Sequence, residues 1–474
     1  MLLVRRSRTW AAAALLTVLA ATCPPGAASD WTRFRGPDGN GVGDGTPAPL
    51  EMRPDSGFVW KHAAPLGKSS PVLAGSRLFY TAYEGERLLT TALDRTTGEV
   101  LWTRELRRAR EDKRSPLNDA AVPTPVTDGE TLYVFFADFG LAAYTVDGRE
   151  LWQRPMGPFS GVHGIATSPL LVEGMLVLML EQLENGSVVG IDASTGEQEW
   201  SAPRPISING SFATPVAYRT PSGEIQAVLT SPFELAAYDP KTGEKLWRVG
   251  GLPHQPKSSP VVVGDLIVVG VQGDTARNNL RSWEDTLSRR DRDGNGVIEG
   301  DEIGGEIDYD RDGAFSRADY DKWHAEKSPP SRMMAVRPRG RGDLTNEAMV
   351  WSVERGVPRV TTPMAYKGVL YLVRNGGIFV SYDLATGEMH KEGRLRDAID
   401  EYFVSPVAVD DKILVASRDC KFTWIEAKPQ WEILQVNDLG EECFATPALG
   451  HDGIFVRTTS AIYRFVSQEA QRQQ

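Results

Sequence analysis

An all-β fold, an eight-bladed β-propeller with a small helical insertion, is predicted by three features of this 474-residue sequence. A serine-proline or threonine-proline pair opens a β-rich stretch eight times, a turn followed by tryptophan closes most of these stretches, and the spacing is broken once. Such a repeat is typical of propellers and solenoids. Because four-stranded units that close into a ring leave few free sheet edges, we expect a closed ring.

The eight pairs give the repeat its period. They are Ser70-Pro71, Thr124-Pro125, Ser168-Pro169, Thr214-Pro215, Ser259-Pro260, Thr362-Pro363, Ser405-Pro406 and Thr446-Pro447. Successive prolines are 54, 44, 46, 45, 103, 43 and 41 residues apart. A period near 45 therefore holds except in the fifth unit, which must contain an insertion, assigned to residues 274–330.

The closing turn has a recognisable chemistry. Aspartate, a Thr-Gly pair and tryptophan follow one another in the segments 94–102, 192–200 and 239–247, and weaker copies precede Trp152, Trp351 and Lys391. In a hairpin, we expect the aspartate to accept backbone hydrogen bonds and the glycine to adopt positive φ. We expect the tryptophan to pack from the following strand.

The last blade needs a strand from elsewhere. The eighth unit ends near Val466 without a turn and tryptophan strand, whereas residues 57–63, with Trp60, form such a strand ahead of the first unit. We predict that this N-terminal strand completes the eighth blade, so that the propeller spans 57–466 and a polar tail follows at 467–474.

These markers resemble the PQQ-like repeat, and the resemblance covers residues 57–466 apart from the insertion. The family includes PQQ-dependent alcohol dehydrogenases and the outer-membrane assembly lipoprotein of the BamB type, so the resemblance implies the fold and no single activity. The segment from Asp30 to Pro37 is similar to the opening of exported BamB-like proteins. We interpret residues 30–56 as a leader segment packed against the ring.

The first 29 residues predict export. Arg5, Arg6 and Arg8 precede an apolar run and then small residues, the order of a secretory signal peptide. No later stretch approaches the ~20 apolar residues of a transmembrane helix. Cys23 matches a lipidation site only loosely, because Thr22 stands where Gly or Ala is expected, so a periplasmic or secreted protein is favoured over a lipid-anchored one.

The charge excludes one class of partner. The formal net charge is −11 with the signal peptide, whose three arginines carry no matching acid, so the mature chain is more acidic still. Nucleic acid is therefore not an expected partner. The sequence gives no oligomeric state.

The insertion carries two segments with the pattern of EF-hand calcium loops. The ligand candidates of the first are Asp291, Asp293, Asn295, Val297 through its carbonyl, and Glu302. Those of the second are Asp308, Asp310, Asp312, Ala314 and Asp319. Hard oxygen ligands suit calcium, which predicts two ions, and the alternative is an acidic surface loop without an ion.

A second candidate site uses the repeat itself. Six polar side chains stand six residues before a repeat proline: Asp119, His163, Asn209, His254, Asp400 and Glu441. Arg359 and Tyr402 lie close by in sequence. If the units are equivalent, these residues ring one mouth of the central channel and could hold a ligand, although loops are commonly polar without binding anything.

Function divides into three hypotheses. The leading one is an exported, non-catalytic scaffold that binds an envelope or extracellular protein partner. A PQQ-dependent dehydrogenase is the main alternative, but the adjacent cysteine pair of that family is absent, since Cys420 and Cys443 are 23 residues apart, so PQQ is not expected. These two cysteines either pair or stay as buried thiols. A hydrolase or carbohydrate-binding module that uses the channel is the third hypothesis.

Overall fold

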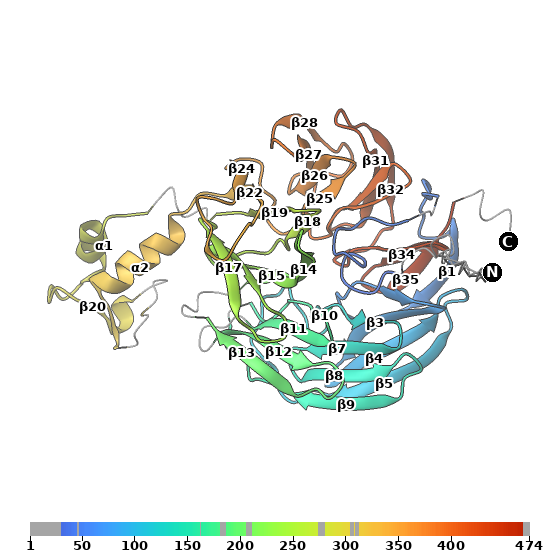
Figure 1. The fold of residues 1–474 in the computed structure, drawn as a ribbon, viewed down its shortest axis with the longest axis horizontal. Helices are drawn as coiled ribbons and strands as arrows, with labels where there is room; N and C mark the ends of the chain where they lie inside the picture. The colour runs from blue at the N-terminus through green and yellow to red at the C-terminus, as the bar shows by residue number, and fades with distance from the viewer. Residues whose placement is uncertain are drawn as a thin grey trace, which may run out of the picture.

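The computed structural model of the chain is a ring of antiparallel sheets around a central axis, eight blades in all (Figure 1). The structure describes residues 30–44, 47–161, 163–180, 186–204, 211–273, 280–303, 308 and 312–467. The predicted all-β propeller is confirmed. The signal peptide with Cys23 and all but the first residue of the predicted tail lie outside the described residues.

Blades 1 to 7 take their strands in sequence order from the axis outwards, and blade 8 takes β1 as its outermost strand. Blades 1 and 2 contain β2 (Val72–Ala74), β3 (Arg77–Glu84), β4 (Arg87–Asp94), β5 (Val100–Arg107), β6 (Val126–Thr127), β7 (Thr131–Phe136), β8 (Gly140–Thr145) and β9 (Glu150–Pro155). Blades 3 and 4 contain β10 (Leu170–Val172), β11 (Met175–Leu180), β12 (Ser187–Asp192), β13 (Gln198–Pro203), β14 (Val216–Arg219), β15 (Ile225–Ser231), β16 (Glu234–Tyr238) and β17 (Lys245–Gly250).

The second half of the ring repeats this order. Blades 5 and 6 contain β18 (Val261–Val263), β19 (Leu266–Val271), β22 (Arg332–Val336), β24 (Met349–Val353), β25 (Met364–Tyr366), β26 (Val369–Arg374), β27 (Ile378–Asp383) and β28 (Met389–Arg394). Blades 7 and 8 contain β29 (Val407–Val409), β30 (Lys412–Ala416), β31 (Lys421–Glu426), β32 (Ile433–Asp438), β33 (Ala448–Gly450), β34 (Gly453–Arg457), β35 (Ala461–Phe465) and β1 (Phe58–Ala63). A short β23 (Gly342–Asp343) adds to β17 in parallel.

Burial explains the residue pattern of the strands. Every residue of β11 and of β19 is buried, because an inner strand packs against the neighbouring sheets on both of its faces. The outermost strands, such as β5 and β13, alternate between exposed and buried positions and bury their tryptophan. Strands near the axis are therefore continuously apolar, whereas the outermost strands alternate between polar and apolar residues.

At five blade junctions of the described chain, a tryptophan of one blade bonds to the turn of the next, whereas Trp247 donates to Gln226 within blade 4. Trp152 of blade 2 donates its indole N–H to the Ala193 carbonyl in the turn of blade 3 at 3.0 Å. A Cβ added to Gly196 of that turn would lie 2.7 Å from the Trp152 ring. Equivalent bonds join four further pairs: Trp60 to Arg95, Trp102 to Val146, Trp200 to Pro240, and Trp351 to Leu384. Glycine is thus needed both for positive φ and for room.

The N-terminal strand closes the ring as predicted. β1 pairs with β35 in antiparallel register, from Phe58 opposite Phe465 to Ala63 opposite Ala461. The first and last units of the chain therefore share one sheet, in which β1 is the outermost of four strands.

The insertion leaves the ring between the second and third strands of blade 5, which β19 and β22 form (Figure 1). It contains α1 (Trp283–Arg290), β20 (Ile298–Glu299), a short 3₁₀ helix (Gly300–Glu302), β21 (Ala314–Phe315) and α2 (Arg317–Lys327). Its own small core gathers Ile298, Phe315 and Tyr320. In the described part of the chain, neither helix is long and apolar enough to cross a membrane.

A disulfide links two neighbouring blades. Cys420, in blade 7, bonds with Cys443, on the segment that leads into blade 8, with 4.9 Å between their Cα atoms. The two cysteines, left open by the sequence, are thus paired and fully buried.

Candidate functional site at the mouth of the central channel

The eight repeat hydroxyls form a closed ring around the axis. In each blade, the backbone N–H of the serine or threonine donates to the hydroxyl oxygen of the equivalent residue in the next blade. The donor-to-acceptor pairs are Ser70 to Thr124 (3.0 Å), Thr124 to Ser168 (2.9 Å), Ser168 to Thr214 (3.2 Å), Thr214 to Ser259 (2.9 Å), Ser259 to Thr362 (3.1 Å), Thr362 to Ser405 (3.0 Å), Ser405 to Thr446 (3.2 Å) and Thr446 to Ser70 (3.0 Å). The residue that marked the repeat is therefore the one that joins the blades at their centre.

The leader segment runs across one side of this ring. Its Trp31 carbonyl accepts from the Leu73 N–H of blade 1 at 2.9 Å, and its Gly41 carbonyl accepts from the Ala408 N–H of blade 7 at 2.8 Å. Between them, Asn40 exchanges two hydrogen bonds with Val262 of blade 5. The leader thereby binds first strands on opposite sides of the axis, and its Phe34 lines the channel.

Two buried arginines fix the leader in place. The Arg33 guanidinium donates to the Pro215 carbonyl at 3.3 Å, and that of Arg35 donates to the Pro363 carbonyl at 2.9 Å. Burial lowers the pKa of Arg33 to about 10 and that of Arg35 to about 9, and Arg33 also lowers the latter by charge repulsion. The leader is thus tied to blades 4 and 6 as well.

On the other side of the hydroxyl ring, the channel widens into a cavity of about 370 Å³. All eight repeat hydroxyls line it, as do the residues that stand three positions before each repeat proline. The latter are Lys68, Val122, Ala166, Phe212, Lys257, Val360, Phe403 and Phe444. Since side chains two apart share one face of an extended chain, both sets point to the axis.

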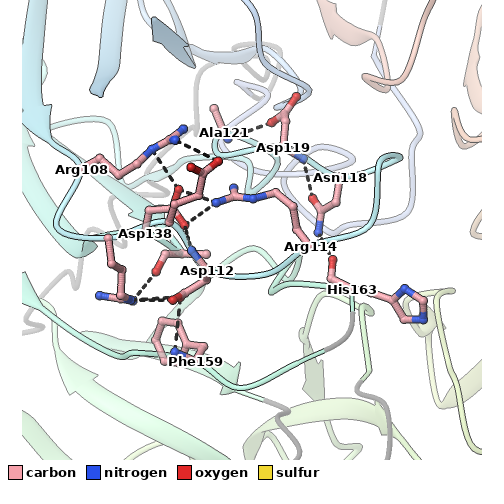
Figure 2. Close-up of polar contacts among 12 residues, drawn as sticks. Arg108, Asp112, Arg114, Asn118, Asp119, Ala121, Asp138, Phe159 and His163 are labelled. Atoms are coloured by element: carbon pink, nitrogen blue, oxygen red, sulfur yellow. Dashed lines mark hydrogen bonds and ion pairs between the residues drawn. The ribbon is translucent and has the colours of Figure 1, made fainter. Parts of the chain in front are cut away.

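A loop of residues 108–122, the mouth loop, forms part of the cavity rim (Figure 2). Its shape depends on Asp138, which is fully buried and pairs with Arg108 at 3.1 Å and with Arg114 at 2.6 Å. The Asp112 N–H also donates to Asp138, at 3.2 Å. A buried carboxylate with two guanidinium partners fixes the geometry of the loop, because any rearrangement would leave a charge buried and unpaired.

The mouth loop also holds His163. The Ser115 N–H donates to the His163 carbonyl at 3.2 Å, and the Asn118 side-chain amide donates to it at 2.8 Å (Figure 2). The imidazole contacts the Phe212 ring edge-on. Burial, and then the Lys257 ammonium, lower the pKa of His163. The neutral imidazole therefore predominates there at pH 7.

Of the predicted mouth residues, His163 and Arg359 line the cavity, and Asn209 lies outside the described residues. Asp119 accepts from the Ala121 N–H at 2.8 Å, and burial raises its pKa. His254 is buried and lies 3.3 Å from the Lys327 ammonium, at the end of α2. These two side chains are outside the described cavity lining.

Two of the remaining predicted mouth residues contact turns of the blade into which they lead. Asp400 accepts from the Asp419 N–H at 2.7 Å, and Glu441 accepts from the Ser460 hydroxyl at 2.6 Å. Tyr402 is buried and donates to the Ala398 carbonyl at 2.6 Å; burial raises its pKa. The structure therefore does not gather the predicted polar ring into one site.

Sequence reasoning missed the lysines and phenylalanines of the cavity. The signal that could have found them is the same repeat alignment, read three rather than six residues before the proline. In that register, two lysines and three phenylalanines stand among small apolar residues.

A family model described as outer membrane protein assembly factor BamB matches residues 53–163 and 91–306, which together span more than half of the chain. The chain belongs to this family.

Curated BamB relatives match parts of the chain. The BamB of Moranella endobia (strain PCIT) is 28% identical over 213 residues, 43% of this chain and 49% of the relative. That of Escherichia coli (strain K12) is 32% identical over 111 residues, 23% of each. The chain thus spans about half, or less, of the length of these relatives. The crystal structure of BamB from Moraxella catarrhalis shares the fold, with a TM-score of 0.53, 11% identity and coverage of 86% of this chain and 98% of that one.

The BamB-type ring carries a second candidate site on its insertion. Side-chain oxygens of Asp291, Asp293 and Glu302 all lie within 4.8 Å of one another. Asp291 accepts the N–H groups of Gly294, Asn295 and Gly296 at 2.7, 3.1 and 2.8 Å, which holds the loop in a tight turn.

Short strands join the two predicted metal loops. Val297 donates its N–H to Asn295 at 2.8 Å, and the next residue, Ile298, pairs with Phe315 across β20 and β21. In the second loop, Asp308 and Asp312 accept backbone N–H groups of Gly313 and Ala314, both at 2.9 Å.

The two remaining ligand candidates of the second loop are Asp310 and Asp319. Asp319 is buried and caps α2, accepting from the Ser316 hydroxyl at 2.6 Å, whereas Asp310 lies outside the described residues. The metal-ligand assignment of this loop stays a prediction.

Proposed function

We propose that this protein is an exported, non-catalytic propeller that binds a partner protein at its mouth face, the face that carries the cavity and the mouth loop. One observation carries the proposal. The channel is crossed by the leader on one side of the hydroxyl ring, while on the other side it opens as a cavity whose rim includes exposed apolar side chains.

Exposed apolar groups on the mouth-face loops support a protein partner. Leu117 of the mouth loop lines the cavity and is 44% exposed, and Leu66 and Ile399, on the equivalent loops into blades 1 and 7, are 56% and 63% exposed. Exposed apolar side chains around a cavity favour association, because covering them removes apolar surface from water. The relatives named above are assembly factors by name, which agrees with binding rather than catalysis.

Site-specific photo-crosslinking in the producing cell tests the proposal. A photoreactive residue at Leu117 or Ile399 should give a discrete adduct with one envelope protein, identified by mass spectrometry. The matched control is Met389 on the outer strand β28, which is 46% exposed and should give no such adduct. Equal adducts from Met389 and Leu117, or none from the mouth face, would refute the proposal.

The proposal extends to the insertion, which we assign to calcium binding. The carboxylates of Asp291, Asp293 and Glu302 converge, and glycines at positive φ, such as Gly296, give the first loop its sharp turn. Oxygen ligands of this kind fit calcium. A bound ion would neutralise carboxylates that otherwise repel one another, and would stabilise the insertion.

Titration calorimetry on the whole protein tests this assignment. Glu302→Gln should abolish the tighter of two calcium isotherms, because it removes one charged oxygen from the first loop. Asp301→Asn is the control, since Asp301 is 90% exposed and is not among the proposed ligands. Equal calcium affinity in the two variants would exclude the first loop as a site.

A further inference from the structure

We infer that the mouth cavity receives an acidic peptide segment of the partner, with two carboxylates that pair with Lys68 and Lys257 on opposite walls. This inference rests on the proposed function and specifies the chemistry of the partner.

The positions of the two lysines follow from the topology. Lys68 belongs to the unit that leads into blade 1 and Lys257 to the unit that leads into blade 5. In a closed ring of eight blades, blades 1 and 5 are diametrically opposed. Both lysines line the cavity, so their ammonium groups approach a ligand on the axis from opposite sides.

Two further pairs of wall positions repeat with the same two-fold relation, whereas blades 3 and 7 supply the unlike residues Ala166 and Phe403. Blades 4 and 8 supply Phe212 and Phe444, and blades 2 and 6 supply Val122 and Val360. The Lys68 ammonium lies 4.3 Å from the centre of the Phe444 ring. The wall thus offers two cationic positions and three aromatic ones, which suits a segment with acidic and apolar side chains.

The floor of the cavity supplies hydrogen-bond donors. Each of the eight ring hydroxyls accepts a backbone N–H from the neighbouring blade. Among the described residues, none of the eight donates to another protein group, so their O–H groups are available to a ligand. Donors at the floor favour an occupant that presents carbonyl or carboxylate oxygens.

The charge of the lining contrasts with that of the molecule. The protein has a formal net charge of −11, yet the described residues that line the cavity include Lys68, Lys257 and Arg359 and no aspartate or glutamate. Burial lowers the pKa of Lys68, while the nearby Asp119 and Glu442 carboxylates raise it. An anionic segment is therefore attracted to the mouth and repelled by the acidic surface elsewhere.

A peptide fits the cavity better than a small solute. The rim residue Leu117 is both part of the lining and 44% exposed, so a ligand that fills the cavity continues onto apolar surface outside it. An extended chain covers both regions at once, whereas a small dicarboxylate covers only the first.

Fluorescence anisotropy with a defined probe tests the inference. The probe is a ten-residue peptide with two glutamates separated by phenylalanine and leucine, labelled with an uncharged dye, and the comparison peptide carries glutamine in place of glutamate. The double variant Lys68→Gln with Lys257→Gln should bind the glutamate peptide at least about tenfold more weakly than the wild type. The control, Lys241→Gln with Lys428→Gln, removes the same charge from lysines that are 61% and 62% exposed, and should change binding less than twofold.

Lys257→Gln alone leaves in place the hydrogen bond from the Lys68 ammonium to the Leu117 carbonyl of the mouth loop, at 2.9 Å. The Lys257 ammonium instead donates to the carbonyl of Gln255, two residues away, at 3.3 Å. This single variant should lose affinity for the glutamate peptide and none for the glutamine peptide.

An equal loss of affinity in the double variant of the cavity lysines and in the control double variant would overturn the inference. So would displacement of the peptide by millimolar glutarate or by PQQ, which would make the cavity a small-molecule site. If crosslinks form at Leu117 but the peptide does not bind, the acidic-peptide inference alone fails.

Discussion

Small side chains set the spacing between blades at the scale of single residues. Gly196 in the turn of blade 3 has φ +76°, and the Trp152 ring of blade 2 covers it. The same arrangement recurs with Gly98 under Trp60 and Gly148 under Trp102. One glycine therefore serves both the turn of its own blade and the docking of the previous blade.

Gly196→Ala should lower the free energy of unfolding by about 2 to 4 kcal/mol, because it adds backbone strain at positive φ to a clash with Trp152. Gly174→Ala is the matched control in the same blade, at φ +79° with no atom within 4 Å of the added Cβ. It should cost only about 1 kcal/mol. Denaturant unfolding measures both, and equal costs would show that the ring contact contributes nothing.

His163 makes stability depend on pH. Burial and Lys257 lower its pKa below the ordinary value of 6.5. The unfolded chain therefore takes up the proton at a higher pH than the folded protein does, so the stability contributed by neutral His163 is complete above pH 6.5 and is lost as the pH falls through the folded-state value. The fall in melting temperature between pH 7.5 and 5.5 should be smaller in His163→Gln than in the wild type; identical slopes would contradict this.

At the scale of elements, the insertion is an addition to blade 5 rather than part of it. The Gly273 N–H donates to the Ser331 hydroxyl at 2.9 Å, so the two ends of the insertion lie side by side. β19 and β22 pair with each other directly below this point, from Val271 opposite Arg332. The insertion core of Ile298, Phe315 and Tyr320 forms a cluster separate from those of the blades.

Replacement of residues 274–330 by a short Asn-Gly turn should therefore leave the ring folded, since the hairpin it closes is already paired. Differential scanning calorimetry of the full protein should show a transition that calcium raises by several degrees over chelator, and the shortened protein should lack it. Loss of the β-rich circular dichroism in the shortened protein would show instead that blade 5 depends on the insertion.

At the scale of the whole molecule, three separate sets of contacts hold the blades in a closed ring. β1 joins the first unit to the last, the repeat hydroxyls join all eight blades at the axis, and the leader binds blades on both sides of the channel. The disulfide between Cys420 and Cys443 adds a covalent link between blades 7 and 8. These links are distant in sequence, so the ring is stabilised as a unit.

Removal of residues 30–44 should destabilise the ring by more than about 3 kcal/mol, because it exposes first strands that Trp31 and the buried Arg35 now cover. Phe34→Ala is the control, because it opens the floor of the cavity and keeps the backbone bonds of the leader. Its cost should be clearly smaller in denaturant unfolding. Equal stability of the truncated protein and the wild type would show that the leader only rests on the ring.

The amino-acid sequence by itself determined the number of blades, the strand that closes the ring and the place of the insertion. These features follow from patterns that are local or strictly periodic, such as Ser259-Pro260 before a buried strand or Asp239 before Trp247. The tertiary structure alone decided which repeat position faces the axis, and that Lys68 and Lys257 oppose each other. It also decided that Trp152 packs on the next blade and that the leader crosses the channel. Those outcomes depend on how strands tilt and twist around a closed ring, which is set by contacts between residues far apart in the chain.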